Sequence, residues 1–327
     1  MKICLLDSTK FQYSYVDRES SSLRGAETIF INLYEQLLRL GHDVTIFNNC
    51  SKLIHDDNSC WYNLETAKNF NINFYVAIAN GDMNLFNYIH SDKKYVISYS
   101  LQSLEKFIRK KQLIPYIKHR PSILVIGNYH KSTRSKLTSL FGLDILPLAI
   151  DDKFNNTKLT SDIDNNLAIF TSRPDRNMDL LIKIWNNNIQ PRNPNLKLLV
   201  TPPLNNISNP NIIMRSLGTK NTLINDLLKS RVFLAPGHKA ELYCLAAEEA
   251  RELCLPIVTL GIGSLSERVV HGKTGFIAKN HDEFADYTIK LFNDNNLWMN
   301  IRSNLLNLRG SKKWNKSVPE LINIIKS

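Results

Sequence analysis

The chain has 327 residues, of which 43% are hydrophobic, and its formal net charge is +11. A chain of this length exceeds one typical core and suits two domains of about 150 residues each. It has no 18-residue apolar span, its N-terminal apolar run is followed at once by Asp7, which predicts no signal peptide, and its five cysteines are scattered without a C-x-x-C pair. We therefore expect a cytoplasmic protein in a reducing compartment and exclude a transmembrane helix, a disulfide framework and a zinc site.

Much of the positive charge is local. From Lys106 to Gly142 there are nine Lys and Arg residues and no Asp or Glu, interleaved with apolar side chains. The stretch is either a solvated basic face or, over residues 106–136, a peripheral contact with the anionic inner face of the cytoplasmic membrane. We expect no nucleic-acid partner, because no nucleic-acid-binding motif accompanies the charge.

The first half of the chain begins with a βαβ pattern. Lys2–Leu6 is an apolar run that predicts a buried strand, and residues 24–41 carry apolar residues at helical spacing before the C-capping Gly41. His42–Phe47 predicts the next strand. Further strands are expected near Phe74–Ile78, Tyr95–Ser98 and Ile123–Ile126.

The second half repeats this alternation of short apolar runs and amphipathic segments. Alternating strands and helices in both halves predict an α/β protein with two doubly wound sheets, and a ligand at the carboxyl ends of their strands. The expected strands are 167–171, 197–200, 212–214, 231–235 and 257–260, and the expected helices are 221–230, 281–293, 296–308 and 318–326.

The stretch from Pro236 to Thr259 predicts a loop, a helix and a strand that follow the strand 231–235. We expect the helix to begin near Leu242, with Glu241 at its start and Glu249 about 80° around it and roughly 12 Å along it. Two carboxylates so placed could hold two ends of a polyol-phosphate ligand near a helix N-terminus, which favours anions. The alternative is an N-capping glutamate and an unrelated exposed glutamate.

Three segments of the second half together resemble a known family. Glu241-x7-Glu249 followed by Leu-Pro-Ile-Val, then Glu267–Ile277 (E-R-V-V-H-G-K-T-G-F-I), and the strand-loop-helix segment Phe170–Leu181 are similar to GT-B retaining glycosyltransferases, family 4 in particular. The resemblance implies two Rossmann-like domains that face each other across a cleft. It places the acceptor-side domain at 1–151, the nucleotide-sugar domain at 152–305, and a helix that crosses back to the first domain at 306–327.

The N-terminal half resembles the same family less closely. Residues 24–47 are similar to its glycine-loop block, but Arg24 replaces the first glycine, so only Gly25 matches; Arg24 would face either the phosphates or solvent. Residues 98–102 stand where relatives often keep a histidine that contacts the donor sugar, and this chain has none there. Residues 146–154 resemble the interdomain linker.

The resemblance also implies roles for individual residues. Glu241 and Arg173 would be catalytic, with the glutamate stabilising an oxocarbenium-like transition state. Arg173 and Arg176 would hold the diphosphate, since arginine forks suit such an anion, and Glu249 would bind the ribose hydroxyls. The remaining donor-binding positions are Gly25, Leu217, Gly218, Leu242, Tyr243, Cys244 and Leu245.

The implied function is a retaining, metal-independent glycosyltransferase. It would move a hexose-type sugar from a nucleoside-diphosphate sugar, with UDP or GDP as the nucleotide, to a hydroxyl of a glycan or glycolipid in lipopolysaccharide or surface-polysaccharide synthesis, and would need no further cofactor. We expect no metal site, because no D-x-D motif stands in a suitable context. Two alternatives are a catalytically silent GT-B binding or scaffold protein and a nucleotide-sugar 2-epimerase.

Overall fold

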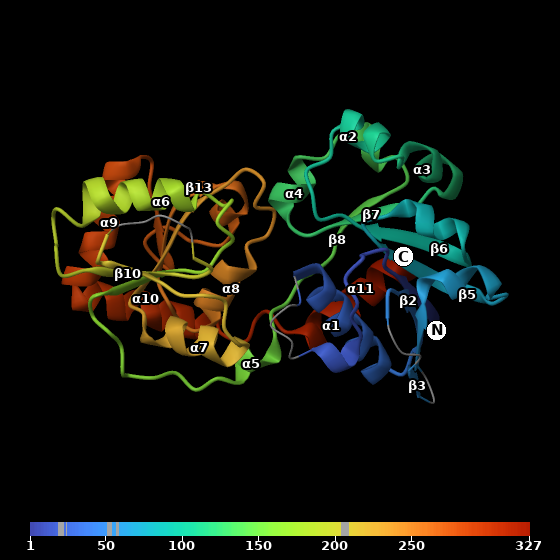
Figure 1. The fold of residues 1–327 in the computed structure, drawn as a ribbon, viewed down its shortest axis with the longest axis horizontal. Coiled ribbons are helices and arrows are strands. Elements are labelled where there is room, and N and C mark those ends of the chain that lie inside the picture. The colour runs from blue at the N-terminus through green and yellow to red at the C-terminus, as the bar shows by residue number, and fades with distance from the viewer. Residues whose placement is uncertain (19–22, 24, 51–53, 57–58, 204–208) are drawn as a thin grey trace. The chain divides into compact units, whose positions relative to one another are not determined.

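The computed structural model describes residues 1–18, 23, 25–50, 54–56, 59–203 and 209–327. The chain forms two compact units (Figure 1). The first comprises Met1–Ala149 together with Trp314–Ser327, and the second comprises Ile150–Lys313. Each unit is a sheet covered by helices, as expected for alternating strands and amphipathic helices.

The sheet of the first unit has the order β3-β4-β2-β1-β5-β6-β7-β8 and is parallel except for the edge strand β3, which runs antiparallel to β4. The order reverses between β1 and β5, because β2 lies on one side of β1 and β5 on the other. The strands are β1 (Lys2–Leu6), β2 (Asp43–Asn48), β3 (Ile54–Asp56), β4 (Ser59–Asn63), β5 (Asn73–Asn80), β6 (His90–Ile97), β7 (Ser122–Val125) and β8 (Leu143–Ile145).

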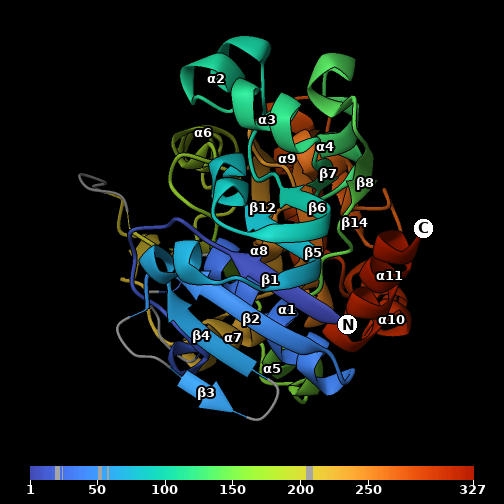
Figure 2. The same ribbon diagram turned by 90° about the vertical axis from the view of Figure 1, so that its right-hand side faces the viewer.

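The amphipathic helix predicted after β1 is α1 (Gly25–Arg39), and it lies beside the C-terminal helix α11 (Trp314–Lys326), as Figure 2 shows. Lys93 of β6 donates to the carbonyl of Ile325 at 2.6 Å, which attaches α11 to the sheet of this unit. The other α-helices are α2 (Leu104–Arg109), α3 (Leu113–His119) and α4 (Asn128–Ser132), and the 3-10 turns are Tyr15–Asp17, Leu64–Asn69, Met83–Asn87 and Lys136–Ser139.

The sheet of the second unit has six parallel strands in the order β11-β10-β9-β12-β13-β14. Neighbouring residues of one strand face opposite sides: Ala168 and Phe170 of β9 contribute to one hydrophobic core and Ile169 to the other. The strands are β9 (Leu167–Phe170), β10 (Lys197–Val200), β11 (Ile212–Met214), β12 (Val232–Gly237), β13 (Ile257–Ile262) and β14 (Gly275–Ile277).

Helices cover both faces of this second sheet. The core that contains Phe170 also contains side chains of α6, α9 and α10, and the core that contains Ile169 also contains side chains of α5, α7 and α8. The helices are α5 (Asp152–Asn156), α6 (Met178–Ile184, continued by a π-helical turn Trp185–Ile189), α7 (Lys220–Lys229), α8 (Leu245–Glu252), α9 (His281–Asn293) and α10 (Asn295–Leu308), with a 3-10 turn at Gly263–Glu267.

The segment between α10 and α11 belongs to the second unit, although 306–327 was expected to be a separate crossing helix. Arg309 pairs with the buried Glu252 at 3.6 Å and donates to the carbonyls of Phe154 and Asn155. The backbone N–H of Gly310 donates to the carboxylate of Glu252 at 2.9 Å. These bonds hold residues 309 and 310 against α5 and α8, so the chain leaves the second unit only after Lys313, and it enters that unit at 150 rather than at 152.

Candidate functional site

Three loops of the second unit meet at the carboxyl ends of adjacent strands, where open parallel sheets bind ligands. They are residues 171–177 after β9, residues 238–244 after β12 and residues 262–264 at the end of β13. One hydrogen bond joins the second and third loops: Ser264 N donates to the carbonyl of Glu241 at 2.9 Å. Within the second loop, Glu241 N donates to the carbonyl of His238 at 2.8 Å.

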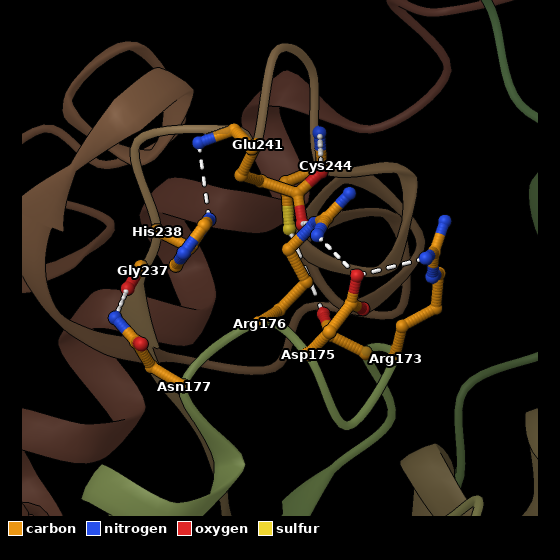
Figure 3. A network of polar contacts seen from close by, with 10 residues as sticks. Arg173, Asp175, Arg176, Asn177, Gly237, His238, Glu241 and Cys244 are labelled. Atoms are coloured by element: carbon orange, nitrogen blue, oxygen red, sulfur yellow. Dashed lines mark hydrogen bonds and ion pairs between the residues drawn. The ribbon is translucent and has the colours of Figure 1, made fainter.

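Two glycines permit this close approach. Gly237 has φ +92°, and a Cβ there would lie 2.5 Å from the carbonyl oxygen of Ile262; Gly263 has φ +73°, and a Cβ there would lie 2.3 Å from the carbonyl oxygen of His238. A side chain at either position would force the loops apart. The amide of Asn177 donates to the Gly237 carbonyl at 2.5 Å, which attaches the first loop to the other two (Figure 3).

Glu241 lies in the middle of this group of loops, as Figure 3 shows. Its carboxylate accepts from the backbone N–H of Cys244 at 3.2 Å and pairs with Nε of Arg176 at 3.3 Å. Burial raises the pKa of Glu241, and Arg176 and the Cys244 N–H oppose that shift. The carboxylate is held in place by two donors, which leaves lone pairs for the hydroxyls of a ligand.

Helix α8 begins at Leu245, not at Leu242, so Glu241 is not at a helix start. Cys244 has φ +60°, a left-handed conformation that cannot continue a helix towards the N-terminus, and residues 241–244 are a turn. The angle and the distance expected between Glu241 and Glu249 therefore do not apply, because they assumed one continuous helix.

The two arginines of the first loop share a carboxylate that the sequence analysis overlooked. Asp175 Oδ2 lies 2.8 Å from a terminal nitrogen of Arg173 and 2.8 Å from one of Arg176. The Arg173 side chain is 73% exposed and the Arg176 side chain 18% exposed. The first guanidinium is thus available to solvent, whereas the second is fixed between Asp175 and Glu241 (Figure 3).

Leu242, Tyr243 and Cys244 are buried, and Leu245 is half-buried. Arg268 holds this turn: its Nε donates to the Tyr243 carbonyl at 2.7 Å, its guanidinium lies 4.1 Å from the centre of the Tyr243 ring, and it pairs with the buried Glu248 at 3.0 Å. Burial raises the pKa of the Cys244 thiol to about 12, so this thiol is neutral at pH 7 and is not a thiolate nucleophile.

Glu249 lies in the middle of α8, beside a second polar group of the same unit. Lys220, the first residue of α7, pairs with Asp151 at 2.6 Å, and both act on the Glu249 carboxyl. Burial raises the pKa of Glu249 to about 8; Lys220 lowers it and Asp151 raises it. The carboxyl is therefore largely protonated at pH 7 in the ligand-free protein.

The remaining predicted donor-binding residues lie on loops or at a helix end. Leu217 and Gly218 are exposed on the connection between β11 and α7. Gly25 is the exposed first residue of α1 in the first unit. Arg24 lies outside the described residues. Among the residues that the structure describes, no three His, Cys, Asp or Glu side chains gather into a set that could hold a metal ion.

Comparison with known proteins identifies the architecture. The sucrose-phosphate synthase of Thermosynechococcus elongatus matches 99% of this chain and 98% of its own, with 12% identity and a TM-score of 0.71. Anabaena HepE in complex with UDP-glucose matches 99% of both chains, with 13% identity and a TM-score of 0.68. WaaG, a glycosyltransferase involved in lipopolysaccharide biosynthesis, matches 99% of both chains, with 11% identity and a TM-score of 0.65. The chain has the GT-B fold.

Residues 209–306 of this GT-B chain also match the family model "Glycosyl transferases group 1". The matched region contains Glu241, Glu249 and the turn between them. No curated protein sequence matches the chain. The family match and the GT-B fold together support glycosyl transfer as the activity.

Proposed function

We propose that this GT-B protein is a retaining glycosyltransferase that moves a hexose-type sugar from a nucleoside-diphosphate sugar to a hydroxyl of a glycan or glycolipid. The observation that carries the proposal is the grouping of Arg173, Arg176 and Glu241 at the carboxyl ends of β9 and β12. Two cations and one fixed carboxylate match a donor that combines a diphosphate with sugar hydroxyls. Anabaena HepE, a protein of the same fold, was solved with UDP-glucose, which supports UDP as the nucleotide; GDP is the alternative.

In this proposal the arginines bind the diphosphate and stabilise the charge that develops on it as the glycosidic bond breaks. The acceptor hydroxyl forms the new bond to the anomeric carbon on the same face, and its proton passes to the departing phosphate oxygen. Glu241 accepts hydrogen bonds from sugar hydroxyls and stabilises the positive charge of the transition state. The arginines supply the charge compensation in this scheme, so we propose that transfer needs no metal ion.

Glu249 would bind the ribose hydroxyls of the nucleotide from α8. Because the pKa of Glu249 is raised to about 8, its carboxyl is neutral below that pH when the ligand binds. A neutral carboxyl both donates and accepts hydrogen bonds. We place the nucleobase near Leu217 and Gly218, whose exposure leaves their backbone groups accessible.

We also propose that helices α2 and α3 contact an anionic membrane surface, which favours a lipid-linked acceptor in surface-polysaccharide synthesis at the inner face of the membrane. No described helix is long and apolar enough to cross a membrane. The two helices and the residues that directly follow them instead expose isolated large apolar side chains beside cations, an arrangement suited to a headgroup layer. The exposed apolar residues are Leu104, Ile108, Ile114 and Ile117, and the exposed cations are Arg109, Lys110, Lys111, Lys118 and Arg120.

A screen of UDP-, GDP-, ADP- and CMP-sugars tests the proposal, with melting temperature and donor hydrolysis as readouts and with EDTA in a parallel series. We expect one nucleotide to raise the melting temperature by several degrees through ligand linkage, with the shift lost in Arg173→Ala and retained in Arg192→Ala. Arg192 is the matched control because it is also an arginine, and it pairs with a single carboxylate, that of Asp286 in α9. A folded protein that responds to no nucleotide would instead support a silent binding or scaffold protein.

A further inference from the structure

A single peptide unit lies between Glu241 and Arg268. The carbonyl of Tyr243 and the N–H of Cys244 belong to the same planar trans peptide bond, so the two groups point in opposite directions. The N–H donates to the Glu241 carboxylate at 3.2 Å (Figure 3), and the carbonyl accepts from Nε of Arg268 at 2.7 Å. The position of the Glu241 carboxylate is therefore coupled to Arg268 through one peptide plane.

The backbone alone does not favour this orientation of the peptide. Cys244 has φ +60° and ψ +74°, and the left-handed region is unfavourable for a residue that has a Cβ. Rotation of the peptide by about 180° would take the φ of Cys244 from +60° to about −120°, a value that any residue adopts. The same rotation would turn the N–H away from Glu241 and the carbonyl towards it, and a carbonyl cannot donate to a carboxylate. Another group must therefore hold the peptide as it is observed.

Arg268 is itself fixed by three further contacts. Its terminal nitrogens lie 3.0 Å from the carboxylate of Glu248 and 3.8 Å from that of Glu267, and its guanidinium lies 4.1 Å from the centre of the Tyr243 ring. The Arg268 side chain is only 8% exposed. Glu248 also pairs with Arg251 at 2.7 Å, so the carboxylate that fixes Arg268 is anchored in turn. An arginine fork fixed in this way loses little further freedom when its Nε donates to the carbonyl.

We propose that Arg268 is a positioning residue: it holds the Tyr243–Cys244 peptide against the strain at Cys244, so that the N–H of this peptide keeps the Glu241 carboxylate in place. The importance of Arg268 for sugar transfer rests on the function proposed above, in which Glu241 contacts the sugar. The coupling between Arg268 and Glu241 does not depend on that function, and it can be measured in the ligand-free protein.

The test is NMR spectroscopy of the ligand-free chain with 15N-labelled cysteine. The chain has five cysteines, and the signal of the Cys244 amide is the one that Cys244→Gly removes. In the wild type this amide should shift as Glu241 ionises, between about pH 4 and pH 8, because it donates to that carboxylate. Glu241→Gln should abolish this pH-dependent shift.

The decisive variant combines Arg268→Met with Glu248→Leu. It leaves the net charge unchanged and replaces a buried ion pair by apolar side chains of similar size, which proteins usually tolerate, so it should fold. We expect the pH-dependent shift of the Cys244 amide to fall several-fold, because the peptide rotates. Arg268→Gln is a second variant with the same expected result, in which Arg251 still pairs with Glu248.

A control and a rescue separate positioning from a general structural role. Arg302→Gln is the matched control, because Arg302 also stacks on an aromatic ring, that of Trp298 at 4.7 Å, and its replacement should leave the Cys244 shift unchanged. In the rescue, Cys244→Gly is added to the decisive variant, and the amide at position 244 is followed with 15N-labelled glycine. Because glycine has no left-handed penalty, this amide should regain at least about half of the pH-dependent shift that it shows in Cys244→Gly alone.

An unchanged Cys244 shift in the folded Arg268 variants would overturn the proposal, because the peptide would then keep its orientation without Arg268. A wild-type Cys244 amide that does not respond to Glu241 would overturn it too, as would a shift that Cys244→Gly fails to restore. The experiment contains no nucleotide, so its failure leaves donor binding to the second unit untouched. A failed nucleotide screen would in turn remove the proposed sugar contact of Glu241 and leave the role of Arg268 in holding the carboxylate.

Discussion

Replacement of Glu249 by Gln should change how the stability of the chain depends on pH. The carboxyl has a pKa of about 8 in the folded protein against 4.5 in a model peptide. When folding raises the pKa of a carboxyl, the folded protein favours its protonated form. The stabilisation from this group is complete below the unfolded pKa, where both states are protonated, and it is lost as the pH rises to the folded pKa. The wild type should therefore lose stability between about pH 4.5 and pH 8, whereas the amide variant should not lose this contribution.

The size of the effect follows from the shift. A difference of 8 − 4.5 = 3.5 pKa units, at about 1.4 kcal/mol per unit, gives a ceiling of about 5 kcal/mol. Because Glu249 is only partly buried, solvent screening reduces this, and we expect about 2 kcal/mol. For a domain of this size that is about 4–8 °C in melting temperature.

The assay is thermal unfolding of the wild type and Glu249→Gln at pH 5 and pH 9. At pH 5 the two should melt within about 2 °C of each other, and at pH 9 the variant should melt about 4–8 °C higher. Glu105→Gln is the control, because the Glu105 side chain is 73% exposed and its replacement should leave the pH dependence unchanged. A variant-minus-wild-type difference that is equal at both pH values would refute the inference that burial neutralises Glu249.

Three further changes test other parts of the account. Asp175→Asn removes the carboxylate that both arginines of the first loop share and leaves Arg176 paired with Glu241. Because exposed ion pairs contribute about 0.2–1 kcal/mol, titration calorimetry should show roughly 2- to 5-fold tighter binding of the nucleoside diphosphate; weaker binding would mean that Asp175 orients the arginines. Tyr99→Phe removes a buried hydroxyl that has no partner among the residues that the structure describes, so urea unfolding should show a gain of about 1 kcal/mol, and a loss would reveal a partner for this hydroxyl. Glu252→Ala leaves Arg309 and the Gly310 N–H without their buried carboxylate, so the same assay should show a loss of about 3 kcal/mol; a loss below about 1 kcal/mol would argue against this attachment.

Most strands of both sheets could be predicted because they are short apolar runs that end in polar, Gly or Pro residues. The helix α9 was predicted with its bounds, since its apolar face is regular and Asn280 caps it by accepting from Glu283 N at 2.8 Å. The strands β3, β4, β8 and β14 were missed. Three of them, β3, β8 and β14, are edge strands of three residues each, and β4 (S-C-W-Y-N) has no continuous apolar run.

The candidate site was less predictable than the fold. The start of α8 was wrong by three residues, because the apolar spacing extends back to Leu242 and nothing in the sequence marks Cys244 as left-handed. Asp175 was overlooked although it stands between two predicted site arginines, and its position in the sequence was the available signal.

The hydrogen bond from the Asn80 amide to the buried Asp7, 3.0 Å long, was missed for a different reason. The two residues are far apart in the sequence, and only the strand order brings them together. The available signals were a carboxylate directly after an apolar strand and an amide at the end of another.

Titration calorimetry can test whether the second unit binds the donor nucleotide. The nucleotide selected by the screen is titrated into the wild type, Arg173→Ala, Glu249→Ala and the control Arg192→Ala. We expect binding to the wild type and to Arg192→Ala with equal affinity. We expect at least about 10-fold weaker binding to the other two variants, because each loses hydrogen bonds to the ligand, one of them charge-assisted. Equal affinity for all four proteins would contradict the claim that the second unit binds a nucleoside-diphosphate sugar between the loop after β9 and helix α8.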